Sequence, residues 1–589
     1  MEFLAQNLAP VMFAALIAML LLGYPVAFAL AANGILFALI GMQLDLLTPA
    51  LFQALPLRVF GIMTNDTLLA LPFFTFMGLI LERSGMAEDL LDTVGQLFGP
   101  VRGGLAFAVV GVGALLAATT GVVSASVISM GLISLPIMLR YGYDRRIATG
   151  VIAASGTLSQ IIPPSLTLII LADQLGRSVG DMYRGALVPG LLLTGMYVLY
   201  VGMLAWMRPN QLPALPPEAR QLREPDGSSG VSSLLVLMSL SLAVAVAANE
   251  AVVGSQAAVD EKFVAGMLTW GLVAFVVAGL NRVLRLGLLS KAAERVTFVM
   301  FPPLFLVFLV LGTIFIGIAT PTEGGAMGAA GALILSLVRR RMSLTLLRQA
   351  MESTTRLTCF ALFILVGSTV FALTFRAVNG DLWVEHLLSS LPGGQLGFLI
   401  FASIFIFVAA FFLDFFELAF IVVPLLGPVA DKMGIDLIWF GILIAVNMQT
   451  SFMHPPFGLA LFYLRSVAAN QDYLDPVTRK MIPRVTTGQI YWGSIPFIVI
   501  QLVMVIVVMS FPGIVLHYKD DVPKIDPSKV RIEVQGGGGK GDPYGISYPG
   551  GPAPAGRPSD SPGGRQDAPA GGNPYELAPA LPAAPAPTQ

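Results

Sequence analysis

Polar residues that could bind an ion or a charged substrate gather at four places in an otherwise apolar sequence. Two places interrupt long apolar stretches: TTGVVSAS, with Thr119, Thr120, Gly121, Ser124 and Ser126, and FLDFFELA, with Asp414 and Glu417. Two others precede proline pairs: Gly156, Thr157, Ser159 and Gln160 before Pro163-Pro164, and Asn447, Gln449, Thr450, Ser451 and His454 before Pro455-Pro456. Oxygen ligands without thiols suit a hard cation such as Na⁺. The free amide and carbonyl groups at the ends of interrupted helices can bind the same ion or an anionic group of a substrate.

Each of these side chains also has a simpler structural role. A hydroxyl group in a membrane helix often bonds to a neighbouring helix. Capping of the return helix is the favoured role of Asp414, ahead of substrate contact. His454 could titrate near neutral pH, but a satisfied hydrogen-bonding group is the commoner role. Glu323 in TPTEGG is expected to form a capping box with Thr320 or Thr322. Only the clustering at the breaks favours ion binding over these roles.

The elements that position these groups are interrupted membrane helices. The apolar stretches 104–118 with 123–139, and 396–413 with 418–430, are too short for ordinary spans, so each pair is expected to form a re-entrant hairpin. Hairpin tips inside a bilayer need protein or a water-filled cavity around their free amides and carbonyls. Pro164 and Pro456 lack an amide proton and should break their helices. The sequence therefore predicts two hairpins and two broken helices.

The two sets of interruptions are related by an internal repeat. Pro163 and Pro455 are 292 positions apart, and the same spacing separates Asp144 from Asp436. It also separates Gly142 from Gly434 and Pro136 from Pro428. One gap-free register therefore aligns four features, as expected for a transporter built from two related halves.

Composition excludes most other classes of protein. Of the 589 residues, 56% are hydrophobic and only 12% are charged, so lipid must be the solvent for most of the chain. A formal charge of −1 provides no general attraction for nucleic acid. With one Cys and three His, the sequence predicts no thiolate or multi-histidine metal centre. It contains no nucleophile elbow or phosphate loop, so no enzyme is predicted.

Hydropathy and charge divide the chain into six regions. We expect scaffold helices in 1–99, the first hairpin and broken helix in 100–172, linking helices in 173–395, and the second hairpin and broken helix in 396–468. A last helix follows in 469–518 and a disordered tail in 519–589, while polar linkers lie at 208–230 and 281–297. If both hairpins re-enter the membrane, the two halves have inverted topology and most Lys and Arg fall on one side of the membrane. An excess of positive charge marks the cytoplasmic side.

Several motifs resemble one family of bacterial transporters. TTGVVSAS, GYDRRIATGVIAASGTLSQIIPPS, TPTEGGAMG, FFLDFFELAFIVVPLLGPVADKMGIDLIWFGI and NMQTSFMHPPFG together look like the large membrane subunit of tripartite ATP-independent periplasmic (TRAP) transporters, the DctM-like family. The resemblance extends to about His517. It implies an all-α, multi-pass, inverted-repeat protein of the bacterial inner membrane that moves substrate by an elevator mechanism.

Carried over to this sequence, the resemblance implies two Na⁺ sites and a substrate site. The first Na⁺ site would involve Thr120, Ser159, Ile162 and Pro164, and the second Ala410, Ser451, His454 and Phe457. Substrate is expected near Gly121, Ser124, Pro163, Asp414 and Pro455. This sequence departs from the family pattern at Ala117, Ser159 and Ser451, and has His454 where the family usually has Thr.

The resemblance also implies partners. These are a small, DctQ-like membrane subunit, expected as a separate chain, a DctP-like periplasmic binding protein and a small organic acid as substrate. The coupling ion would be Na⁺. A stand-alone Na⁺- or H⁺-coupled organic anion symporter of similar architecture remains the alternative, and it would transport without a binding protein.

Overall fold

The computed structural model describes residues 2–120, 123–220, 230–254 and 259–519. The side chains of several residues beside the gaps, including 118–120, are outside the description. The expected tail lies outside the described residues apart from Lys519, and the polar linker expected at 208–230 lies partly outside them. All described residues belong to one compact unit, Met1–Pro523.

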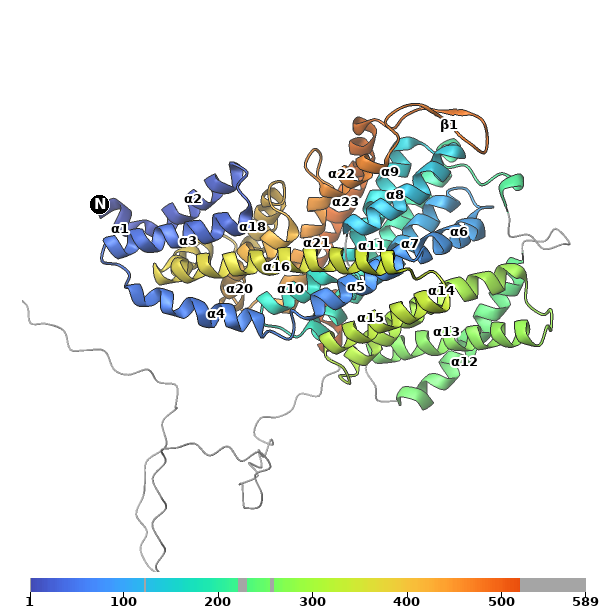
Figure 1. Cartoon of the computed structure of the whole chain (residues 1–589), viewed down its shortest axis with the longest axis horizontal. Helices are drawn as coiled ribbons and strands as arrows, with labels where there is room; N and C mark the ends of the chain where they lie inside the picture. The colour runs from blue at the N-terminus through green and yellow to red at the C-terminus, as the bar shows by residue number, and fades with distance from the viewer. Residues whose placement is uncertain (1, 121–122, 221–229, 255–258, 520–589) are drawn as a thin grey trace, which may run out of the picture. The chain divides into compact units, whose positions relative to one another are not determined.

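Among its described residues, the amino-terminal half has helices as its only regular elements, and it contains the first hairpin and the first broken helix (Figure 1). Its elements are α1 (Glu2–Gln6), α2 (Leu8–Leu21), α3 (Val26–Gln43), η1 (Pro49–Gln53), α4 (Ala54–Met63), α5 (Ala70–Arg83), α6 (Met86–Phe98), α7 (Gly104–Thr120), α8 (Val123–Arg140), α9 (Arg145–Thr157), η2 (Leu158–Gln160), α10 (Leu166–Gln174) and α11 (Val179–Met207).

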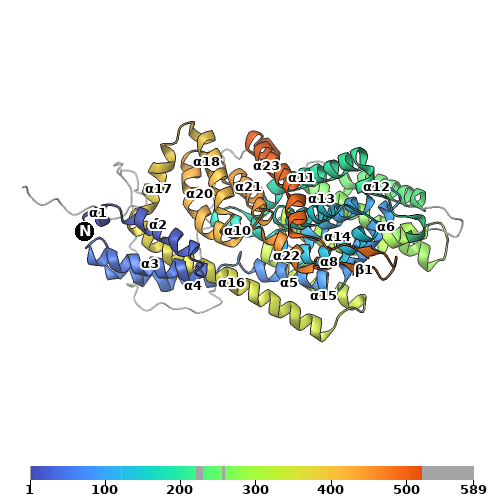
Figure 2. The ribbon, with the colours of Figure 1, turned by 90° about the horizontal axis from the view of Figure 1, so that it is seen from above.

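The linking region consists mainly of long helices. Its elements are η3 (Pro209–Gln211), η4 (Pro217–Ala219), α12 (Val231–Val253), α13 (Val259–Val283), α14 (Lys291–Phe315), α15 (Pro321–Val338), α16 (Leu344–Ala377) and α17 (Gly380–Ser389). Helix α16 packs against α3 and α5 (Figure 2), and α13 packs against both α12 and α14 (Figure 1). The Thr320 side chain caps α15, and Glu323 completes the capping box that the sequence predicts.

The carboxyl-terminal half repeats the hairpin and the broken helix. Its elements are α18 (Gly394–Ala409), α19 (Phe415–Glu417), a π-helical turn η5 (Leu418–Val422), α20 (Val423–Lys432), α21 (Leu437–Gln449), η6 (Thr450–Phe452), α22 (Leu459–Val467), β1 (Tyr473–Leu474), β2 (Met481–Ile482), α23 (Thr487–Ser510), α24 (Gly513–Leu516) and η7 (His517–Lys519). The strands pair antiparallel, with Tyr473 opposite Ile482.

The 292-residue register is confirmed by the positions of the elements. Helices α9 and α21 begin and end at equivalent residues, and each continues into one 3₁₀ turn, η2 or η6. Asp144 caps α9 through the amides of the second and third residues after it, and Asp436 caps α21 in the same way. Gly142 and Gly434 both have positive φ, at 84° and 76°, which suits glycine. The two sequences therefore fold in the same way locally.

Both predicted helix breaks are present, and the hairpins need one correction. Residues 161–165 separate η2 from α10, and residues 453–458 separate η6 from α22; both proline pairs contain a cis peptide bond. The return arm of the first hairpin, α8, has 18 residues and is long and apolar enough to cross a membrane. The stretch predicted from the sequence, 123–139, ends one residue before this helix, which continues through Arg140 and thereby reaches a length that can span a membrane.

Close backbone packing holds the first broken helix in place. Helix α9 packs against α23, where a Cβ atom at Gly150 would lie 2.1 Å from the Gly493 carbonyl oxygen. Only glycine at such a crossing lets the backbones come this close. Because α9 is buried along most of its length, the polar residues at its end are held deep inside the protein.

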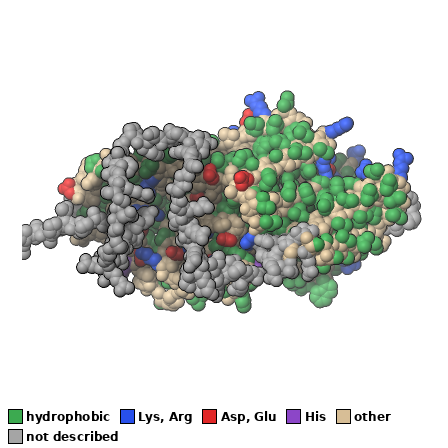
Figure 3. Space-filling model, turned by 90° about the horizontal axis from the view of Figure 1, so that it is seen from below, with side chains coloured by type: hydrophobic (Ala, Val, Ile, Leu, Met, Phe, Trp, Pro, Cys, Tyr) green, Lys and Arg blue, Asp and Glu red, His purple; other side chains and the backbone are tan. Residues whose placement is uncertain are grey.

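The surface of the described chain suits a lipid environment. Among the described residues, eight helices are long and apolar enough to span a membrane, or nine if the bent pair α17 and α18 counts as one span. In the right-hand part of Figure 3, hydrophobic side chains cover most of the visible surface, and several Lys and Arg side chains project at its rim. Large apolar side chains such as Leu235, Val236 and Val246 of α12 are well exposed. The chain is therefore a multi-pass, all-α membrane protein.

Candidate functional site

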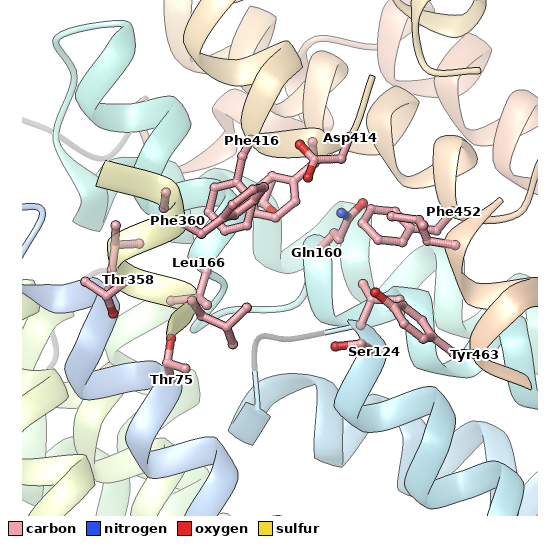
Figure 4. Close-up of a pocket in the computed structure, with 17 residues that line it drawn as sticks. Thr75, Ser124, Gln160, Leu166, Thr358, Phe360, Asp414, Phe416, Phe452 and Tyr463 are labelled. Atoms are coloured by element: carbon pink, nitrogen blue, oxygen red, sulfur yellow. The ribbon is translucent and has the colours of Figure 1, made fainter. Parts of the chain in front are cut away.

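A cavity of about 240 Å³ lies where both hairpins and both helix breaks meet two scaffold helices (Figure 4). The first hairpin contributes Ser124 and the second contributes Asp414. The residues that line the cavity are Leu71, Thr75, Val123, Ser124, Gln160, Leu166, Thr167, Leu357, Thr358, Phe360, Ala361, Asp414, Phe415, Phe416, Phe452, Leu459 and Tyr463. Interruptions that are hundreds of residues apart in the sequence therefore surround one space.

Asp414 has the capping role that the sequence favours. Its Oδ1 atom accepts a hydrogen bond of 2.9 Å from the Glu417 amide, and Glu417 Oε2 accepts one of 2.9 Å from the Asp414 amide. This reciprocal capping box fixes the start of α19. Asp414 also lines the cavity, so the capped end of the return helix faces the site.

Two buried polar groups in the cavity wall have no hydrogen-bond partner. Both side-chain polar atoms of Gln160, a residue only 1% exposed, are unpaired, and so is the hydroxyl oxygen of Thr358. An unpaired buried polar group costs about 1–3 kcal/mol. Gln160 extends from the first break and Thr358 from scaffold helix α16, so both can serve a polar ligand in the cavity.

A polar network joins the two repeats beside the cavity. Gln449 Nε2 donates to Thr157 Oγ1 at 3.2 Å, and these two residues occupy equivalent positions 292 residues apart. Gln501 Nε2 donates to the same hydroxyl at 3.3 Å and to the Tyr197 hydroxyl at 3.0 Å. Equivalent positions of the two broken helices are therefore in direct contact inside the protein.

The first predicted Na⁺ site gathers around the first break. Ser159, Ile162 and Pro164 are all buried, and residues 161–165 lie outside regular helix. Ser159 Oγ donates to the Gly156 carbonyl at 3.0 Å, so this hydroxyl still has lone pairs available. Pro163, predicted to contact substrate, lies in the same turn but does not line the cavity. Backbone carbonyls outside a helix and hydroxyls are ligands that suit Na⁺.

The residues predicted at the first hairpin tip are described only in part. Thr120 is the last residue of α7, but its side chain is outside the description, and Gly121 lies outside the described residues. Ser124 is described and lines the cavity.

The residues of the second predicted Na⁺ site lie at the end of α18 and at the second helix break, where several aromatic rings pack. Ala410 is buried at the end of α18, and Ser451 is buried in η6. Phe457 is half exposed, with its ring 6.4 Å from that of Phe411. Pro455, which was predicted to contact substrate, does not line the cavity.

The expectation that His454 is a satisfied hydrogen-bonding group is wrong. Neither ring nitrogen has a partner, and the side chain is only 2% exposed. The imidazole ring instead lies 4.3 Å from the rings of both Phe407 and Phe411. The physical reason is the phenylalanine-rich end of α18, which surrounds the position with apolar carbon.

Sequence reasoning missed much of the cavity wall. Thr75, Thr358 and Tyr463 were not selected, nor was an aromatic surface made by Phe360, Phe415, Phe416 and Phe452. The doubled phenylalanine in FLDFFELA, beside the selected Asp414, was the available signal. Thr75 and Thr358 carried no signal because they lie within ordinary helices, α5 and α16.

These features define a class of protein. A multi-pass helical chain with two related halves, whose interrupted helices enclose a cavity, has the construction of a membrane permease. Among the described residues, no group of three His, Cys, Asp or Glu side chains could hold a transition-metal ion.

Comparison with known proteins identifies the family. Residues 13–514 match the family described as "Tripartite ATP-independent periplasmic transporter, DctM component", and the chain belongs to this family. It is therefore a TRAP large permease of the bacterial inner membrane.

Relatives with curated descriptions are similar to most of the chain. The "C4-dicarboxylate TRAP transporter large permease protein DctM" of Pseudomonas aeruginosa is 26% identical over 80% of this chain and 90% of its own length. The protein of the same description from Rhodobacter capsulatus is 27% identical over 77% and 88%. The "Isethionate TRAP transporter permease protein DctMQ" of Oleidesulfovibrio alaskensis is 23% identical over 80% of this chain but 63% of its own length.

Proposed function

We propose that this permease imports a small organic acid together with Na⁺, after a periplasmic binding protein has delivered the acid. The observation that supports this most is the cavity to which both hairpins and both broken helices contribute. A site built from interrupted helices offers carbonyl groups to cations and helix amino ends to anions at the same depth in the membrane.

Coupling follows from the position of the proposed ion sites. Na⁺ near Ser159 and Ser451 would flank the cavity and supply the positive charge that its described lining residues lack. An organic anion then binds well only when Na⁺ is bound, so each ion lowers the free energy of binding of the other. The paired hairpins and breaks would move as one body against α5 and α16, which is an elevator mechanism.

The proposal includes two protein partners. A small membrane subunit on a separate chain would pack against the scaffold, and the binding protein would dock on the periplasmic side.

Uptake by reconstituted vesicles tests the proposal. The permease and its small subunit are placed in proteoliposomes, and the binding protein is added outside with its radiolabelled ligand. We expect uptake only with an inward Na⁺ gradient and with binding protein present. Undiminished uptake after replacement of Na⁺ by choline would reject Na⁺ coupling. Uptake without binding protein would instead favour the stand-alone symporter.

A further inference from the structure

The charge of the cavity wall limits the acid that can bind there. No Lys, Arg or His is among the described residues that line the cavity, and the sequence AATTGVV around the undescribed hairpin tip contains none either. Arg356, next to the lining residue Leu357, lies instead in a separate groove with Arg348 and Glu352. Asp414 adds a carboxylate to the wall. A second negative charge on a substrate would therefore meet no protein cation and would be repelled by this group.

One end of the cavity can still hold a single carboxylate. Helices α10 and α22 have nine residues each, and their first residues, Leu166 and Leu459, line the cavity. The amino end of a helix carries partial positive charge and free amide groups. Gln160, buried and unpaired, lies in the same wall and can donate through Nε2. The proposed Na⁺ ions would neutralise the remaining charge.

The rest of the cavity wall can bind a flat apolar group of a substrate, such as an aromatic ring. Four phenylalanine rings form a continuous surface from scaffold helix α16 to the second helix break. The ring centroids of Phe360 and Phe416 are 5.9 Å apart, and these two rings are perpendicular. The centroids are 3.9 Å apart for Phe416 and Phe415, and 6.4 Å apart for Phe415 and Phe452. Aromatic rings bind other rings by edge or offset contacts. In another protein, an engineered apolar cavity of about 150 Å³ admits benzene. The present cavity, at about 240 Å³, can hold a ring with a short carboxylate chain.

We propose that the substrate of this permease is a monocarboxylate with an aromatic or similarly flat apolar body, and not a C4-dicarboxylate. The inference rests on the proposed function, because it takes this cavity as the transport site and Na⁺ as its counter-ion. The carboxylate lies at the amino ends of α10 and α22 beside Gln160. The apolar body lies against Phe360, Phe416 and Phe452.

Equilibrium binding to the purified complex tests the inference without requiring the binding protein. The permease with its small subunit is placed in nanodiscs, and binding of radiolabelled phenylacetate is measured in NaCl and in choline chloride. Unlabelled succinate, which carries two negative charges at neutral pH, is the competitor. We expect Na⁺-dependent binding of phenylacetate and competition by succinate that is about ten-fold weaker.

Two variants show where the probe binds. Phe416→Leu should weaken phenylacetate binding about five-fold, because a ring contact is lost while apolar volume is largely kept. Phe401→Leu, an aromatic change on the same hairpin outside the cavity, should leave binding unchanged. Equal effects of the two variants would overturn the location of the site.

The outcomes separate this inference from the proposed function. A Na⁺-dependent rise in melting temperature, measured without any acid, tests the ion sites alone. Suppose that Na⁺ stabilises the complex, but that succinate binds as well as phenylacetate or that neither acid binds. The proposed substrate class is then wrong, while the proposed Na⁺ coupling stands. If Na⁺ has no effect on the melting temperature or on binding, the proposed function fails.

Discussion

Thr157 is the residue at which the two halves of the permease meet. Its hydroxyl accepts hydrogen bonds from Gln449 and Gln501 and donates to the Ala154 carbonyl at 2.8 Å. All three polar side chains are buried. Removal of this hydroxyl would therefore leave two amide groups without one of their acceptors.

We expect Thr157→Val to lower the free energy of unfolding by about 1–3 kcal/mol, the usual cost of buried polar groups left unpaired. Thr194→Val is the matched control, because the Thr194 hydroxyl bonds only to the Gly190 carbonyl of its own helix. Thermal unfolding of the two purified variants measures the difference. Equal losses of stability would contradict a structural role for the network between the repeats.

His454 is expected to be dispensable for ion coupling. Its ring makes only apolar contacts with Phe407 and Phe411, so no hydrogen bond is lost in His454→Thr. We expect Na⁺-dependent uptake to persist, with a stability loss of about 1–3 kcal/mol from the space left between the rings. Uptake at a series of Na⁺ and H⁺ concentrations provides the measurement. Complete loss of uptake in a folded variant, or a change to H⁺ dependence, would give His454 an essential role.

At the residue scale, sequence analysis was most successful where local chemistry fixes a role. The sequence predicts helix caps before α15 and α19; Thr320 forms one together with Glu323, and Asp414 forms the other together with Glu417. Thr358 and Tyr463 could not be selected, because only tertiary packing brings their helices to the cavity. No sequence pattern shows that these helices lie beside the cavity.

At the scale of elements, the β1–β2 hairpin ties α8 to the segment before α23. The Arg140 side chain at the end of α8 donates to Asp475 Oδ1 at 2.9 Å. The Thr478 amide and hydroxyl both donate to Asp475 Oδ2 at 2.7 Å. Burial would raise the pKa of Asp475, but these hydrogen bonds and the charge of Arg140 outweigh it and lower the pKa to about 2.

This lowered pKa predicts a pH dependence of stability. The unfolded carboxyl has a pKa near 3.8, so its stabilising contribution is complete above about pH 4 and is lost as the pH falls toward 2. We expect Asp475→Asn to cost about 1–2 kcal/mol at neutral pH, since a charged acceptor is replaced by a neutral one. The difference from the wild type should shrink below pH 4.

Unfolding of the two proteins at several pH values checks this prediction. Glu352→Gln is the control, because its ion pair with Arg348 is exposed at both side chains and should contribute little. A difference between Asp475→Asn and the wild type that stays constant down to pH 2 would contradict the assigned hydrogen bonds.

Elements with a repeated counterpart could be predicted closely from the sequence. The spacing of Gly, Asp and Pro-Pro places α9 and α21, together with their breaks. Helices α4, α6 and α17 were not expected, because they are short and mixed in polarity, and a hydropathy window detects only spans. The π-helical turn η5 leaves no mark on hydropathy either.

At the scale of the whole molecule, we expect one cavity that opens first to one side of the membrane and then to the other. Composition and the internal repeat indicated a membrane transporter, and the family match confirms that class. The sequence could not predict that the two hairpins and the two helix breaks surround one cavity. This arrangement depends on how helices from distant parts of the chain pack together.

Alternating exposure of the cavity is the most direct test of this account. Ser124→Cys is introduced after Cys359→Ser has removed the single native thiol, and an impermeant maleimide is applied to right-side-out and to inside-out vesicles. We predict that Cys at this position reacts from both sides and that Na⁺ changes the two rates in opposite directions. Reaction from one side only, at a rate that neither Na⁺ nor substrate changes, would contradict the account.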